Sequence, residues 1–205
     1  MIVMEFLEGG ELHQHQKRIG RFTLPQTKFY VSEVCLALEY LHKKSIAYRD
    51  LKPENMVIHK DGHVMLTDFG LAKHVEKGQK TYSFCGTPEY ICPEIINSDG
   101  HNQLVDWWAF GILTYEMLCG FPPFRSDKSE ATYKLIRDAR VDYPKHMDAA
   151  SKDLIGKLLI PSTTDRLGAG GKDATAGAEQ VKKHKFFRGT DWFAIISRGV
   201  APPKL

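Results

Sequence analysis

The sequence predicts a mainly helical fold that carries one small β-hairpin. Apolar residues recur at helical spacing after Thr23, and between Val105 and Leu118 they cover nearly every face of a helix. Between these segments, two short apolar runs flank Asp61-Gly62, a pair that favours the positive φ angles of a turn. With 205 residues, 42% of them hydrophobic, the chain is long enough for one substantial core, so we expect one domain.

The N-terminal third opens with a strand and a helix. Met1 to Leu7 is a short apolar run closed by Gly9-Gly10, which indicates a buried strand entering a turn. Thr23 and Gln26 fit the capping box that begins a helix. Apolar residues then follow at spacings of three and four, and we expect this helix to end near His42.

The rest of the chain reads as the hairpin and further helices. Residues 57–59 and 63–66 predict the two strands of the hairpin. The segment from Val105 to Leu118 predicts a helix buried on all sides, which forms the centre of the fold. Shorter amphipathic helices are expected at residues 128–137, 149–159 and 178–184.

Composition excludes several classes of function. The formal charge of +3 is too small to indicate a nucleic-acid binder. The run Lys182-Lys183-His184-Lys185 could touch a membrane or an acidic partner, but a solvated helix end is favoured. The four cysteines form no C-x-x-C pair, which argues against a zinc site or a disulfide framework. We find no secretory signal and no membrane span, and expect a reducing compartment, the cytoplasm or also the nucleus.

Two loops beside the hairpin hold what phosphoryl transfer from a nucleotide requires. That reaction needs a metal held by oxygen ligands, positive charge on the transferring group and an acceptor for the substrate hydroxyl proton. Residues 48–55 read Tyr-Arg-Asp-Leu-Lys-Pro-Glu-Asn, and residues 68–70 read Asp-Phe-Gly. In an extended loop, Lys52 lies on the same side as Asp50, where it can neutralise phosphoryl charge.

These loops resemble those of the AGC group of serine/threonine protein kinases, most closely the cAMP-dependent branch, and the resemblance covers essentially the whole chain. Further matching motifs are Glu8-Gly9-Gly10-Glu11-Leu12, Phe84-Cys85-Gly86-Thr87-Pro88-Glu89-Tyr90, Asp106-Trp107-Trp108, Gly120-Phe121-Pro122-Pro123-Phe124 and Arg166-Leu167-Gly168. The implied fold is the large, C-terminal lobe of a protein kinase, with only the last strand of the small lobe at residues 1–7.

The resemblance implies an ATP- and Mg²⁺-dependent enzyme. Asp50 is then the base that orients the substrate hydroxyl, and Lys52 neutralises the γ-phosphoryl charge. Asn55 and Asp68 hold magnesium. Phe69 is expected to pack inward, while the following glycine allows the backbone to aim Asp68 at the metal.

The resemblance also assigns nucleotide contacts. The backbone of Glu5 and Leu7 would hydrogen-bond the adenine, and Glu11 would reach the ribose. Val57 would lie beneath the adenine ring, although a plain core position explains a small apolar residue there equally well.

An activating phosphate is implied at Ser83. Phosphate adds nearly two negative charges, which Arg49 and Lys73 could pair with to order the loop beside the catalytic residues. The alternative is that Ser83 is an ordinary polar loop residue.

Other matched residues imply substrate selection and structural support. The Thr87 hydroxyl is expected near Asp50 and Lys52, a feature associated with serine/threonine specificity. Glu94 and Arg166 are expected to form a buried ion pair that anchors the loop to the helical core.

Substrates with basic residues upstream of the phosphoacceptor are implied by carboxylates at Glu11, Glu54 and Glu116, because carboxylates grip guanidinium groups through bidentate hydrogen bonds. Glutamates on a solvated face are the alternative. A cyclic-nucleotide-binding regulatory subunit is implied by the family alone.

The sequence lacks the small-lobe motifs with which a kinase binds the nucleotide phosphates. It contains no G-x-G-x-x-G and no strand with the matching lysine. We therefore expect residues 1–189 to be a partial kinase domain and residues 190–205 to begin the C-terminal extension of the group. The alternative is a truncated, catalytically inactive lobe that acts as a binding or regulatory module.

Overall fold

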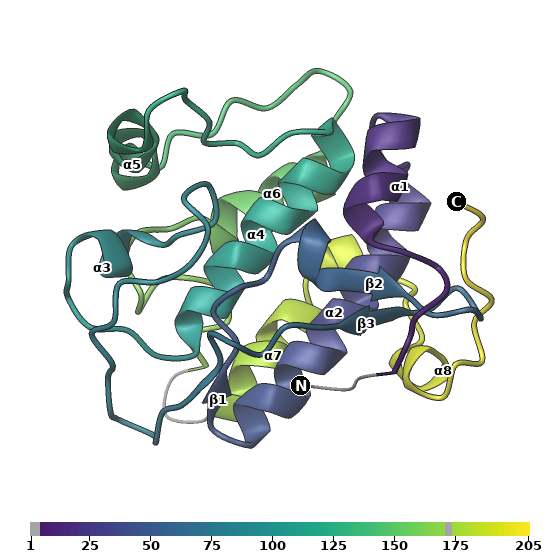
Figure 1. The fold of residues 1–205 in the computed structure, drawn as a ribbon, viewed down its shortest axis with the longest axis horizontal. Coiled ribbons are helices and arrows are strands. Elements are labelled where there is room, and N and C mark those ends of the chain that lie inside the picture. Colours follow the sequence, from purple (N-terminus) through teal and green to yellow (C-terminus); the bar gives the residue numbers. More distant parts are fainter. Residues whose placement is uncertain (1–4, 171–173) are drawn as a thin grey trace.

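The structure, a computed structural model, describes residues 5–170 and 174–205, which form a helical body with a hairpin against one side (Figure 1). The helices are α1 (Leu12–Ile19), α2 (Leu24–Lys43), α3 (Pro93–Ile96), α4 (Leu104–Cys119), α5 (Ser129–Asp138), α6 (Ala149–Leu158), α7 (Ala174–Lys182) and α8 (Trp192–Ile196). The strands are β1 (Ile46–Ala47), β2 (Met56–Ile58), β3 (Val64–Leu66) and β4 (Lys73–His74). The mainly helical fold with a small hairpin is confirmed.

Helix α4 forms the centre of the core. Its residues from Val105 to Leu118 are all buried, as their apolar character on every face predicts. It packs against α2 and α6. The approach to α6 is close at Gly111, where a Cβ atom would stand 2.9 Å from the Cβ of Leu158. A glycine is therefore required for this helix packing.

Helix α2 begins and ends as predicted. The Thr23 side chain accepts from the backbone N–H of Gln26, whose side chain accepts in turn from the backbone of Thr23, so the capping box is complete. The helix ends at Lys43 and packs against α4, α7 and β3. It packs against the hairpin, which it crosses from behind in the view of Figure 1.

The hairpin pairs β2 and β3 in antiparallel register, with Met56 opposite Leu66 and Ile58 opposite Val64. Only Gly62 of the Asp-Gly pair has a positive φ, +88°, so the turn is wider than a two-residue loop. Residues 9–11 run along the free edge of β2, where the N–H of Gly9 donates to the carbonyl of Ile58 at 3.0 Å. The edge of β2 thus fixes residues 9–11 beside the hairpin.

A second small sheet was not predicted. Strands β1 and β4 pair antiparallel, with Ile46 opposite His74 and Ala47 opposite Lys73. Each has only two residues, too few to show an alternating pattern in the sequence. Their pairing holds the segment after residue 70 beside the loop that follows α2.

The N-terminal segment differs from the expectation. Glu5 to Leu7 have no strand structure, and residues 1–4, the remainder of the expected strand, lie outside the described residues. A lone extended segment has no partner for its backbone groups. Helix α1, which follows, was missed. Its signals were Lys17 and Arg18 in the last turn and Gly20 at its end.

The basic run at the end of α7 is neutralised locally. Lys182 pairs with Glu39 and Glu179, while His184 and Lys185 both contact Asp153. This favours the solvated helix end over a membrane or acidic partner. Within the described part of the chain, no helix combines the length and apolar character needed to cross a bilayer.

The end of the chain lies against the hairpin turn (Figure 1). The Arg198 guanidinium donates to Asp61 at 2.7 Å, and the side chain of Gln26 donates to the carbonyl of Lys204 at 2.9 Å. The residues after α8 are therefore held by both the turn and the start of α2.

Candidate active site

A carboxylate on the central helix fixes the loop at residues 48–55. Asp106 accepts the backbone N–H of Tyr48 at 3.0 Å and that of Arg49 at 2.8 Å, and the imidazole of His42 lies 2.8 Å away. Arg49 has a φ of +67°, a strained backbone conformation for a residue other than glycine. Asp106 is completely buried, so the strained loop is tied to the most rigid element of the fold.

Asp50, Lys52 and Thr87 meet as predicted. The Lys52 ammonium lies 3.1 Å from the Asp50 carboxylate and 3.0 Å from the Thr87 hydroxyl. That hydroxyl also lies within 3.2 Å of Asp50. Asp50 is only 8% exposed. A nearly buried carboxylate beside an ammonium group can orient a hydroxyl and offset negative charge developing next to it.

Asn55 and Asp68 lie next to one another at the open end of the hairpin. The Asn55 amide nitrogen donates to the Asp50 carboxylate at 2.7 Å, so its amide oxygen is left for another partner. The N–H of Thr67 donates to the carbonyl of Asn55 at 2.9 Å, which places the exposed Asp68 one residue away.

These two oxygen donors fit magnesium. Mg²⁺ prefers hard oxygen ligands and is commonly held by one or two protein groups together with substrate phosphates. The described residues contain no group of three or more His, Cys, Asp or Glu side chains arranged to hold a metal by themselves. Asn55 and Asp68 therefore suit a metal that arrives with a nucleotide.

The Asp-Phe-Gly segment departs from two expectations. Phe69 is 50% exposed and does not pack inward, although its ring forms a T-shaped pair with that of Tyr48 at a centroid distance of 5.3 Å. The left-handed residue is Asp68, with a φ of +50°, and not Gly70. The N–H of Gly70 donates to the Asp68 carboxylate at 3.0 Å, which stabilises that conformation.

The predicted nucleotide contacts fall into two groups. Glu11 and Val57 form an isolated antiparallel bridge, so they lie side by side at the edge of β2. Leu7 is half-buried and Glu5 is exposed, in the irregular segment that precedes Gly9. The structure thus brings Glu11 and Val57 together and leaves Glu5 outside any element.

Ser83 lies among cations. The Arg49 guanidinium donates to the Ser83 hydroxyl at 2.8 Å, and Lys73 donates at 2.7 Å to Thr81, whose hydroxyl is 3.4 Å from that of Ser83. Among the ion pairs of the described residues, none involves Arg49 or Lys73. The exposed Ser83 hydroxyl therefore adjoins positive charge that has no carboxylate partner.

His101 also contacts this cluster, and the sequence patterns did not indicate it. Its Nε2 atom is 3.3 Å from the same Arg49 nitrogen that contacts Ser83. Two backbone hydrogen bonds, of 2.9 and 2.8 Å, join residue 101 to Thr81. The ring is buried, and this burial together with the charges of Arg49 and Lys73 lowers the pKa of His101 to about 4.

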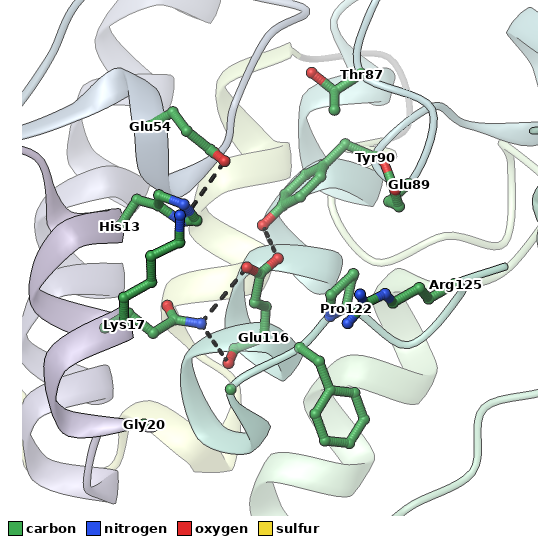
Figure 2. A pocket seen from close by; sticks show the side chains of 13 residues that line it. His13, Lys17, Gly20, Glu54, Thr87, Glu89, Tyr90, Glu116, Pro122 and Arg125 are labelled. Atoms are coloured by element: carbon green, nitrogen blue, oxygen red, sulfur yellow. Dashed lines mark hydrogen bonds and ion pairs between the residues drawn. The ribbon is translucent and has the colours of Figure 1, made fainter. Parts of the chain in front are cut away.

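A pocket of about 510 Å³ opens beside Thr87 (Figure 2). Its lining comprises His13, Gln16, Lys17, Gly20, Glu54, Thr87, Glu89, Tyr90, Glu116, Gly120, Phe121, Pro122 and Arg125. Of the carboxylates predicted to read basic substrates, Glu54 and Glu116 line the pocket and Glu11 does not. Glu89 adds a carboxylate, while the contribution of α1 was missed together with that helix.

Glu116 forms the floor of this pocket. The Tyr90 hydroxyl donates to its carboxylate at 2.6 Å, and the Gln16 amide lies 3.5 Å from its other oxygen (Figure 2). Burial raises the pKa of Glu116. At the mouth, Glu54 is exposed and lies 3.6 Å from the His13 imidazole. The carboxylates therefore span the depth of the pocket.

The expected ion pair between Glu94 and Arg166 is present and bidentate. The two guanidinium nitrogens donate to the two carboxylate oxygens at 2.7 and 2.9 Å, and both side chains are buried. Arg166 also donates to the carbonyls of Ile160 and Leu104 and stacks over the Trp108 ring at 5.2 Å. The pair joins α3 to the start of α4 and to the loop after α6.

Known proteins resemble this chain over its whole length. The family model for the protein kinase domain matches residues 1–187. The chain is 48% identical over 202 residues to the cAMP-dependent protein kinase catalytic subunit PRKX of Mus musculus, which covers 98% of this chain and 55% of that protein. It is 46% identical over 204 residues to the cAMP-dependent protein kinase catalytic subunit 3 of Drosophila melanogaster, which covers 100% of this chain and 34% of that protein.

A second branch gives a similar match. The ribosomal protein S6 kinase beta of Caenorhabditis elegans is 45% identical over 203 residues, which covers 98% of this chain and 36% of that protein. The chain thus spans about half the length, or less, of these curated relatives. The resemblance predicted from the catalytic-loop motifs is confirmed, and the chain belongs to the protein kinase domain family.

Proposed function

We propose that this chain is the large lobe of a serine/threonine protein kinase that transfers the γ-phosphate of ATP to serine or threonine hydroxyls of basic protein substrates. The observation that carries the proposal is the contact between Asp50, Lys52 and Thr87, with Asn55 bonded to Asp50. The sequence contains no G-x-G-x-x-G loop, so the test below supplies a small lobe.

The roles of the central residues follow from their contacts. Asp50 accepts hydrogen bonds, and a substrate hydroxyl entering beside Thr87 would donate to it in the same way. Lys52 stands between these two groups, where its charge offsets that of an incoming phosphoryl. The Asn55 amide oxygen and the Asp68 carboxylate would hold Mg²⁺, which supplies charge neutralisation of the nucleotide phosphates.

The adenosine end of ATP would lie along the edge of β2. Val57 and Glu11 are adjacent there, and we propose that they contact the adenine face and the ribose. Backbone groups of Glu5 and Leu7 would complete the adenine contacts.

The pocket of Figure 2 suits a guanidinium side chain of the substrate. Glu54, Glu89 and the buried Glu116 supply carboxylates, and an arginine in this space would gain charge-assisted hydrogen bonds. Glu11, outside the pocket, would read a second basic residue. We therefore propose arginine-containing substrates as the preferred class.

Phosphorylation of Ser83 is the proposed activation step. A phosphate there would meet Arg49 directly and Lys73 by way of Thr81. Because Arg49 also precedes Asp50 in the strained loop, pairing with a phosphate would order the loop that holds the base.

Two proposals rest on the relatives. Residues 190–205 would begin a C-terminal extension, in keeping with the contacts of the last residues with the hairpin turn. The names of two relatives include cAMP dependence, which supports a cyclic-nucleotide-binding regulatory subunit as a partner.

The test joins the chain to the small lobe of the Mus musculus relative and measures phosphate transfer from radiolabelled ATP to two peptides, one with arginines upstream of serine and one with alanines. We expect transfer to the arginine peptide, with Mg²⁺ required, and at least about a hundred-fold loss in Asp50→Asn. If a folded fusion that binds ATP transfers no phosphate, the chain is instead a binding module.

A further inference from the structure

The phosphate site proposed at Ser83 has a third neighbour, His101, to which the proposed function assigns no role. Arg49 and Lys73 are the cations that the loop sequence identifies, but the imidazole of His101 contacts the same guanidinium nitrogen as the Ser83 hydroxyl, at 3.3 and 2.8 Å. The ring is 3% exposed. Its position is fixed by the two-way backbone bridge between residues 81 and 101.

We propose that His101 is a further phosphate-binding residue, which becomes an imidazolium and donates from Nε2 to a phosphate on Ser83. This rests on the proposed phosphorylation of Ser83. The geometry requires no rearrangement of the backbone, because the ring and the hydroxyl flank one nitrogen of Arg49. A phosphate on the hydroxyl adds three acceptor oxygens, each of which accepts more than one hydrogen bond, so a donor on His101 has an acceptor within the same cluster.

The charges around the ring explain why His101 gains a proton only when an anion is present. Arg49 and Lys73 oppose its protonation, whereas Glu94 and Asp106 favour it, and burial adds to the opposition. Without phosphate, Nε2 can only accept the Arg49 hydrogen bond. A doubly negative phosphate between the ring and the two cations favours protonation of His101. The Nε2 atom, which accepted a hydrogen bond before, then donates one.

Two consequences follow for the phosphorylated loop. The phosphate gains a donor from the segment before α4, so the loop is tied to that segment as well as to residues 48–55. Its attachment also becomes pH-dependent, since the imidazolium loses its proton as the pH rises. The Ser83 phosphate should then be best protected from hydrolysis at the acidic end of the physiological range.

The direct test is the pKa of His101 by NMR in two forms of the 205-residue chain, one with serine and one with phosphoserine installed at position 83 during translation. We expect the pKa of His101 to rise by about one unit or more on phosphorylation. His146, which contacts the carbonyl of Leu118, serves as the internal reference, and its NMR signals should be the same in the two forms. An unchanged pKa of His101 would overturn the proposal.

Variants give a second readout. In His101→Gln and His101→Phe, a phosphatase should remove the Ser83 phosphate several-fold faster than in the wild type at pH 6.5, with a smaller difference at pH 8.5. His146→Phe should match the wild type at both values. Equal removal rates in all forms, with circular dichroism showing the variants folded, would contradict the proposal.

The two proposals can fail separately. Mass spectrometry of the protein after incubation with an activating kinase tests whether Ser83 is modified at all. The NMR experiment uses installed phosphoserine, so it reports on His101 whatever that result is.

Discussion

Replacement of Arg166 by methionine should destabilise the protein severely. The substitution removes two hydrogen bonds to Glu94, at 2.7 and 2.9 Å, and two to the carbonyls of Ile160 and Leu104, each at 3.0 Å. It keeps an unbranched apolar chain over Trp108. The main consequence is thus electrostatic: the Glu94 carboxylate stays buried without its cation.

The magnitude follows from that orphaned charge. Burial alone raises the pKa of Glu94, but the hydrogen bonds and charge of Arg166 outweigh it and hold the pKa below its ordinary value. Removal of one partner of a buried pair costs about 3–5 kcal/mol. Since domains of this size are stable by only about 5–15 kcal/mol, the variant should lose about a fifth or more of its free energy of unfolding.

The assay is urea unfolding followed by circular dichroism. Glu94→Gln should show a loss similar to that of Arg166→Met, and the double variant Glu94→Leu/Arg166→Met should recover much of it, because no unpaired charge remains. Lys43→Ala, which removes an exposed lysine and leaves Glu39 paired with Lys182, is the control and should change stability by less than about 1 kcal/mol. A loss below about 1 kcal/mol in Arg166→Met would refute this reasoning.

Three other predictions follow from single contacts. Gly111→Ala should lower the free energy of unfolding by about 1–3 kcal/mol in the same urea assay, because its Cβ would meet Leu158 at 2.9 Å. An unchanged urea midpoint would show that α6 shifts to accommodate the Cβ atom. Glu116→Gln in the small-lobe fusion should raise KM for the arginine peptide about ten-fold or more and leave KM for the alanine peptide unchanged, and equal effects on both would exclude Glu116 as the arginine contact. The pKa of His101 is about 4 when folded, below the ordinary 6.5, so the unfolded chain binds more protons and stability should fall as the pH drops from 6.5 to 4. His101→Phe should flatten that part of the urea-midpoint profile, and an identical profile would contradict the assignment.

Elements with strong local signals were predictable from the sequence. Helix α2 has both a capping box and an apolar stripe, and α4 is apolar on every face, so burial and local chemistry agree. The hairpin was signalled by Asp61-Gly62 between apolar runs. Helix α1 was missed because Leu12 and Ile19 are its only apolar residues, so it has no apolar stripe, and a polar residue, Gln16, is buried against Glu116.

Without the family resemblance, from which the contacts of Thr87 with Asp50 and of Glu94 with Arg166 were expected, the site was predictable only where chemistry imposes fixed spacing. Asp50, Lys52 and Asn55 lie within six consecutive residues, and their contacts are local. The neighbours supplied by distant elements were not visible in the same way. Asp106, His101 and the α1 side of the pocket approach the loop through tertiary packing, which no spacing in the sequence encodes.

The most direct measurement of the central claim compares γ-phosphate transfer by the 205-residue chain with transfer by the same chain joined to a small lobe, each with and without Asp50→Asn. If Asp50, Lys52, Asn55 and Asp68 form the catalytic half of a kinase cleft, the joined chain transfers phosphate to the arginine peptide, the separate chain transfers little, and Asp50→Asn abolishes the difference. Transfer by the joined chain that survives Asp50→Asn would contradict the account.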